Sequence, residues 1–161
     1  MSMTGRYLKL SAEQLEAVIS ESVDVSDLVW PEDGNYPAEP LDIDKTWHVI
    51  HFLLTGEVWG GEYPLCNAVL GGTELPGTDA GYGPFRYLTP DEVQSTAKAL
   101  AEISPADLWV RFIPEDDEVA EIYGWIGDEM QFEYVSENYE PLRTYFSEAA
   151  AAGKAMLLHL S

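Results

Sequence analysis

The chain of 161 residues carries 29 Asp and Glu against eight Lys and Arg, which gives a formal net charge of -21 at pH 7. A single cysteine excludes a disulfide framework and cysteine-based zinc sites, and a hydrophobic content of 46% is too high for a disordered acidic chain. No apolar run is long enough to span a bilayer and no signal peptide is recognisable, so we expect a cytoplasmic protein whose residues 1–161 form one domain.

Local signals divide the first half of the chain into four parts. In chain order these are a strand over residues 3–10, a helix over 11–19, an acidic connection over 22–41 with one helical turn near 26–30, and a helix over 42–56. Ser11 and Gln14 form a capping box at the start of the first helix. Asp42 or Asp44 caps the second helix, and Gly56 is well placed just beyond its last residue.

The second half alternates short strands with helices. In chain order we expect a short buried helix or strand over 64–70, a loop over 73–83, a strand over 84–88, helices capped by residues 89 and 104, a helical stretch over 128–152 and a strand over 154–160. Pro141 either kinks the long helix or splits it, in which case Asn138 caps a second helix. We therefore predict an α+β fold, a single compact domain in which a small, mostly antiparallel sheet with strands near 3–10, 84–88 and 154–160 packs with several helices.

The acidic residues are unevenly spread along the chain. Ten lie between Lys9 and Lys45, and ten more lie between Arg111 and Arg143, with no Lys or Arg inside either stretch. This charge either keeps the protein in solution or forms an acidic face for a basic partner. A calcium site over residues 114–118 lacks the ligand spacing of an EF-hand loop. The basic residues are scattered, so we expect no binding to nucleic acid or to membranes.

One polar stripe stands out on the helix expected over residues 42–56. At 100° per residue, Asp44, His48, His51 and Thr55 lie within about 60° of one another, and most of the remaining surface is apolar. Three interpretations remain open. The stripe is the solvent-facing edge of a buried helix, it lines a cleft that binds a ligand or a partner, or its two histidines share a metal ion. We expect neither a metal nor a cofactor, because the HExxH arrangement is absent.

Other catalytic signals are weaker. The chain has no nucleophile elbow and no glycine-rich phosphate-binding motif. Cys66 lies in an apolar run and is more typical of a core residue than of an activated thiol, although a pair with one of the histidines stays open. His48 and His51 are therefore the candidates for catalysis.

Two segments resemble the YfbM-like family of bacterial proteins, a domain of unknown function. They are LDIDKTWHVIHFLLTG over residues 41–56 and GYGPFRYLTPDEV over residues 81–93, and the opening and closing strands fit as well. The resemblance implies a compact α+β domain, without an established activity, cofactor or catalytic residue. It directs attention to the glycine-rich loop before Arg86, and we expect Asp79, Tyr82 and Arg86 to border one depression together with the polar stripe.

Arg86 has two possible roles. It either anchors an anion or forms an ion pair with Asp42 or Asp44, and we favour the ion pair because lone arginines commonly pair with nearby acids. For the whole protein, the leading hypothesis is an acidic protein that binds a basic protein partner, as inhibitors and immunity-type proteins do. The alternatives are a hydrolase or isomerase that uses His48 or His51 as a base, and a sensor that binds a small ligand without chemistry. We lean towards a protein without catalytic activity.

Overall fold

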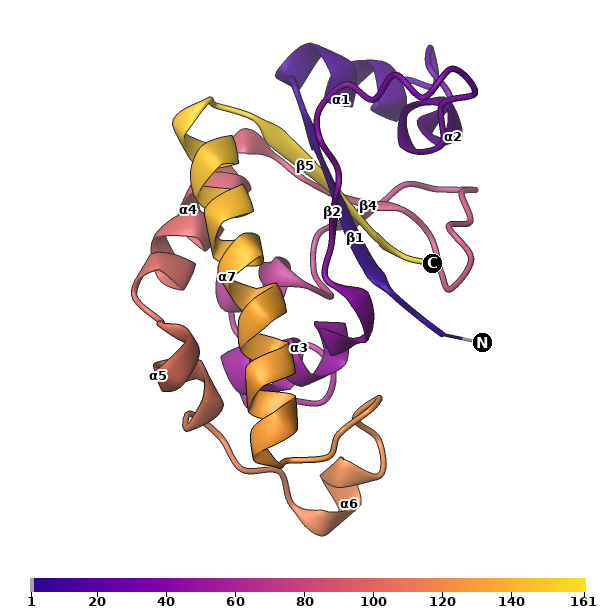
Figure 1. Ribbon diagram of the computed structural model, residues 1–161. Helices are drawn as coiled ribbons and strands as arrows, with labels where there is room; N and C mark the ends of the chain where they lie inside the picture. Colours follow the sequence, from indigo (N-terminus) through magenta and orange to yellow (C-terminus); the bar gives the residue numbers. More distant parts are fainter. Residues whose placement is uncertain (1) are drawn as a thin grey trace.

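Five strands form one antiparallel sheet within residues 2–161, the part of the chain that the computed structural model describes (Figure 1). The strands are β1 (Gly5–Leu10), β2 (Leu41–Asp42), β3 (Thr73–Glu74), β4 (Arg86–Leu88) and β5 (Ala155–Leu160), and their order across the sheet is β2-β1-β5-β4-β3. The two long strands β1 and β5 pair along their whole length, from Gly5 opposite Leu160 to Leu10 opposite Ala155. The predicted α+β class with a mainly antiparallel sheet is therefore confirmed.

Helices lie on both faces of this sheet. Within residues 2–161 they are α1 (Ala12–Ile19), α2 (Val25–Val29), α3 (Trp47–Thr55), α4 (Pro90–Ala101), α5 (Pro105–Trp109), α6 (Asp116–Val119), α7 (Glu129–Ala151) and the 3-10 helices η1 (Asp44–Thr46) and η2 (Leu65–Ala68). Figure 1 shows the long α7 beside α4, with α1 and α2 at one end of the molecule and α6 at the other. Across the same residues, no helix combines the length and the apolar composition that crossing a membrane requires.

The sheet separates two apolar cores, because side chains alternate between the faces of a strand. Tyr7, Met156 and Leu158 point into the larger core, where they meet residues of α3, α4, α5 and α7. Leu8 and Leu157 point into the smaller core, which α1 and α2 cover. β5 is consequently buried on both faces, as its continuous apolar sequence predicts.

The helix expected over residues 42–56 begins later than predicted. Asp42 belongs to β2, where it lies opposite Arg6, and the regular α-helix starts only at Trp47. The physical reason is a turn at Asp44, whose backbone has a φ of 55° and whose N–H donates to the Asp42 carboxylate at 2.7 Å. The end of the helix is as predicted, because Gly56 adopts the left-handed conformation there.

α7 is one continuous helix, with Pro141 in its interior. The alternative in which Asn138 caps a second helix is wrong, since its side-chain amide donates to the Tyr134 carbonyl one turn earlier. Buried residues before and after the proline, such as Val135 and Phe146, pack into the same core. This packing holds the helix together where local propensity alone would break it.

The capping box at the start of α4 provides a first prediction. The Thr89 hydroxyl accepts a hydrogen bond from the Glu92 N–H, while the Glu92 carboxylate accepts one from the Thr89 N–H. We expect Thr89→Ala to lower the free energy of unfolding by about 1 kcal/mol, measured by urea denaturation. Thr89→Ser keeps the acceptor and serves as the control; equal losses in the two variants would contradict a capping role.

Candidate functional site

α3 is buried along nearly its whole length, including its polar stripe. His48 is 1% exposed and His51 is 0% exposed, so the interpretation of the stripe as a solvent-facing edge is wrong. The helix packs against η2, α5 and α7, and the segments around Val58 and Tyr123 reach the His48 side chain. These coverings come from distant parts of the sequence, which the helical periodicity does not reveal.

His48 is fixed by two backbone groups. Its Nδ1 accepts the Tyr123 N–H at 2.8 Å, and its Nε2 lies 2.9 Å from the Val58 carbonyl. Because an amide N–H can only donate and a carbonyl can only accept, the proton must sit on Nε2 and the imidazole is neutral. Burial also lowers the pKa of His48, which favours the same neutral state.

His51 is buried in the interior, where the Gly60 backbone is the polar group that approaches its ring. Neither of its ring nitrogens has a hydrogen-bond partner within residues 2–161. Burial, together with the nearby His48, lowers the pKa of His51 to about 4, so this ring is also neutral at pH 7. A general base needs a free ring nitrogen within reach of a substrate. The geometry of the two imidazoles therefore gives no support to an enzyme that uses either one as a base.

Three further residues suggested by the sequence make local structural contacts. The Asp44 carboxylate accepts the Tyr134 hydroxyl at 2.6 Å. The Thr55 hydroxyl donates to the His51 carbonyl at 2.9 Å, and the Asp79 carboxylate accepts the Gly81 N–H at 2.8 Å. Among residues 2–161, no group of three or more His, Cys, Asp or Glu side chains is placed to hold a metal ion.

Arg86 has a structural role, but not the one expected. Its Nη1 donates to the carbonyls of Val69 and Gly71, each at 2.8 Å, which ties the segment after η2 to β4. The expected ion pair with Asp42 or Asp44 is wrong, because the guanidinium that approaches the Asp42 carboxylate, at 3.5 Å, belongs to Arg6. Arg86 lies in β4, and the hydrogen bonds of its Nη1 go to the two neighbouring backbone carbonyls.

Two of the suggested residues, His48 and Tyr82, do line one depression. It has a volume of about 510 Å³, and its wall includes Trp47, His48, Trp59, Tyr82, Glu121 and Tyr123. We call it the aromatic recess. Tyr82 reaches it because its N–H donates to the Leu160 carbonyl at the end of β5, which anchors the glycine-rich loop there. The side chains of the other five candidates lie outside the wall of this recess.

Four rings of the recess pack in succession, stacked between Tyr123, Trp47 and His48 and tilted between His48 and Trp59. The ring centroids are 5.4 Å apart for Tyr123 and Trp47, 4.8 Å for Trp47 and His48, and 4.5 Å for His48 and Trp59. Trp47 and His48 are nearly parallel, with an angle of 2° between their planes. The row thus runs from the half-buried Tyr123, through the buried Trp47 and His48, to Trp59, which is 60% exposed.

Trp59, Glu121 and Tyr123 also line the recess and were not among the residues predicted from the sequence. A signal for Trp59 was present, because a tryptophan between Gly56 and the pair Gly60-Gly61 lies in a turn too short to bury a large ring. Glu121 and Tyr123 carried no such signal. They reach the recess only because the chain after α6 folds back over α3.

A second hollow adjoins the recess and shares Tyr123 and Gly124 with it. Its volume is about 630 Å³, and its wall includes Lys45, Ile126, Met130 and Tyr134. We call it the α7 groove, because Met130 and Tyr134 lie on the first turns of that helix. Ile126 and Met130 are 70% and 78% exposed, which is unusual for large apolar side chains.

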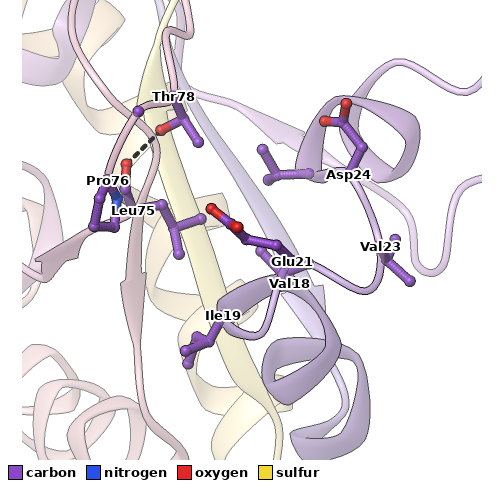
Figure 2. A pocket seen from close by; sticks show the side chains of 10 residues that line it. Val18, Ile19, Glu21, Val23, Asp24, Leu75, Pro76 and Thr78 are labelled. Atoms are coloured by element: carbon purple, nitrogen blue, oxygen red, sulfur yellow. Dashed lines mark hydrogen bonds between the residues drawn. The ribbon is translucent and has the colours of Figure 1, made fainter.

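A third hollow lies at the other end of the molecule, between the turn that follows α1 and residues 75–78 (Figure 2). Its volume is about 270 Å³. Figure 2 shows the Glu21 carboxylate extending towards Leu75, while Thr78 uses its hydroxyl to donate to the Leu75 carbonyl at 2.7 Å. The residues suggested by the sequence lie away from this cleft, which we regard as a junction between two loops.

Comparisons with known proteins provide a family and a fold. The family model DUF1877, described as a domain of unknown function, matches residues 1–159. The solved structure of YfbM from Escherichia coli, a protein of unknown function, is similar to this chain with a TM-score of 0.70 and 21% sequence identity, over 98% of this chain and 99% of that chain. No curated protein matches significantly. The resemblance to the YfbM-like family is thus confirmed, and the function has to be argued from the surface of this chain.

Proposed function

We propose that this chain, which belongs to the DUF1877 family, is a binding protein that captures a basic protein partner on the surface around the α7 groove. The observation that carries the proposal is an apolar groove set in an acidic surface. A partner that combines Lys or Arg side chains with an apolar anchor matches both properties of this surface.

The negative charge is displayed outwards and is largely unpaired. Every Asp and Glu is exposed except Asp44, Glu92 and Glu118, which are half-buried. Among residues 2–161, three carboxylates form ion pairs, those of Asp42, Glu140 and Glu148. A surface with so many free carboxylates attracts cationic proteins over distances up to the Debye length, about 8 Å at physiological ionic strength.

The α7 groove provides the contact that charge alone lacks. Ile126 and Met130 stand out from the surface beside it, and exposed methionines adapt readily to the shape of a partner. Glu129 and Glu133 are exposed on the same two turns of α7. An apolar side chain of the partner would fill the groove while its basic residues face these acids.

The proposal predicts a capture that depends on salt and on this end of α7. The immobilised protein should retain a basic protein from cell lysate at low salt and release it as the salt concentration rises. We expect the double variant Glu129→Lys/Glu133→Lys to lose this capture, because it reverses two charges beside the groove. Mass spectrometry of the retained fraction identifies the partner and its charge.

A matched control lies on α1. Glu13→Lys/Glu16→Lys changes the net charge by the same amount, and Glu13, like Glu129, occupies the first turn of its helix. This control should keep the capture. Equal loss in both double variants would mean that the partner responds only to overall charge, and retention by the Glu129→Lys/Glu133→Lys protein would place the interface elsewhere.

A further inference from the structure

From the geometry of the aromatic recess we infer that it binds the alkylated ammonium group of an organic cation. The inference does not depend on the partner proposed for the α7 groove, because it rests on Trp59, Tyr82 and Glu121, which line the recess and not the groove. The volume of about 510 Å³ lies within the usual range for small-molecule sites.

Exposed aromatic rings line the recess and offer their faces to a cation. Trp59 is 60% exposed and Tyr82 is 37% exposed, and both side chains contribute to the wall. The π-face of an aromatic ring carries partial negative charge and attracts a cation, most strongly in tryptophan. Trp59 packs against His48 with 4.5 Å between the ring centroids and 41° between the ring planes, and this contact helps to hold its ring beside the recess.

The charge of the recess also favours a cation. Glu121 contributes a carboxylate to the wall, and it forms no ion pair with any residue of the described range 2–161. No Lys or Arg of that range lines the recess. His48 is neutral there, since its Nδ1 accepts a backbone N–H. A cation that enters the recess therefore meets one negative group and no positive one.

The few free hydrogen-bond acceptors of the recess favour an alkylated ammonium over a primary amine. A primary ammonium needs acceptors for three N–H groups. His48 bonds to Val58 and Tyr123, and the Leu160 carbonyl accepts the Tyr82 N–H, which leaves the Glu121 carboxylate as the charged acceptor that remains in the wall among the described residues. A trimethylammonium group has no N–H to satisfy, so it loses nothing in a wall that offers mainly rings.

The inference is tested with choline and its neutral isostere 3,3-dimethylbutan-1-ol, which has nearly the same shape but no charge. Titration of the full-length protein, followed by tryptophan fluorescence and by NMR shifts of the indole signals, measures both affinities. We expect choline to bind at least about tenfold more tightly than the alcohol. Equal affinities, or no saturable binding of choline, would overturn the inference.

Two variants with matched controls locate the site. Trp59→Ala should weaken choline binding about tenfold, while Tyr63→Ala, which removes another exposed ring from the neighbouring turn, should leave it unchanged. Glu121→Gln should weaken choline binding about threefold to tenfold. Its control is Glu137→Gln on α7, which also removes one exposed negative charge and should leave choline binding unchanged. Binding that survives both Trp59→Ala and Glu121→Gln would overturn the assignment to this recess. Because Trp59 and Glu121 are exposed, these substitutions leave the core intact, as far-UV circular dichroism should show.

The same chemical group occurs on small metabolites and on methylated lysines of proteins. A short peptide with trimethyl-lysine is therefore compared with choline and with the unmodified lysine peptide. Tighter binding of the methylated peptide than of choline assigns the natural ligand to a protein, and the reverse order assigns it to a small molecule. Tighter binding of the unmodified lysine peptide would mean that the recess favours a primary ammonium, and it would overturn the inference.

Discussion

The protein is expected to lose about 4 kcal/mol of stability between pH 7 and pH 5, because two histidines are buried in their neutral form. His51 and His159 are 0% and 3% exposed, and their ring nitrogens have no hydrogen-bond partners within residues 2–161. Burial lowers the pKa of each to about 4, with a further contribution from His48 at His51 and from Arg6 and Arg86 at His159.

The sign follows from proton uptake. An unfolded histidine has a pKa near 6.5, so between pH 6.5 and pH 4 the unfolded chain binds more protons than the folded protein. Stability is therefore fully present above pH 6.5 and decreases as the pH falls through this window, by about 1.4 kcal/mol per pH unit for each histidine.

Urea unfolding at pH 7, 6 and 5 measures the effect. The double variant His51→Leu/His159→Leu removes two of the three buried histidines and replaces unpartnered polar rings by apolar ones. We expect its free energy of unfolding to change by less than that of the wild-type protein over the same interval, and the change that remains comes from His48, whose pKa burial also lowers. A variant that loses as much stability as the wild-type protein would show that other groups cause the acid sensitivity.

The second large effect is expected at Arg86. Arg86→Met should lower the free energy of unfolding by about 3 kcal/mol, because the carbonyls of Val69 and Gly71 lose a charged hydrogen-bond donor. For a domain of this size, the midpoint of thermal unfolding should fall by about 6–12 °C. Thermal and urea denaturation at pH 7 provide the two measurements.

Arg6 offers the matched control on β1, which β5 separates from β4 in the sheet. Arg6→Met removes the same charge, but the Arg6 guanidinium is exposed and its ion pair with Asp42, at 3.5 Å, lies in solvent. An exposed pair of this kind contributes less than about 1 kcal/mol. Similar losses in the two variants would mean that Arg86 acts through the charge of the whole protein and not through the backbone carbonyls.

The fold was predictable where local signals and burial agree. Ser11 and Thr89 head capping boxes that the structure contains, and the continuous apolar run of β5 identified a strand buried on both faces. The structure differs from the predicted helices where a single side chain turns the backbone, or where packing into the core outweighs the local preference of a residue. Asp44 turns the chain before α3, and the packed stripe of α7 overrides Pro141.

The candidate site was predictable only in part. Helical periodicity placed His48 on a distinct stripe, and the glycine-rich loop pointed to Tyr82; both line the aromatic recess. The periodicity could not show that His51 is sealed, because the segments that cover α3 are remote in sequence. Glu121 and Tyr123 come from such a segment, so no local pattern identifies them as part of the recess.

The central pair of strands also sets the order in which the protein can be built. β1 leaves the ribosome early, but its partner along the whole length is β5, whose last paired residue is Leu160. Until β5 is made, the nascent chain lacks the strand that joins β1 to β4. The larger and the smaller apolar core then lack the central strand that lies between them. Closing so long a loop is slow. Completion of the sheet therefore waits for the synthesis of β5, and a chain that stalls before residue 155 would present an unpaired β1 edge to chaperones and proteases.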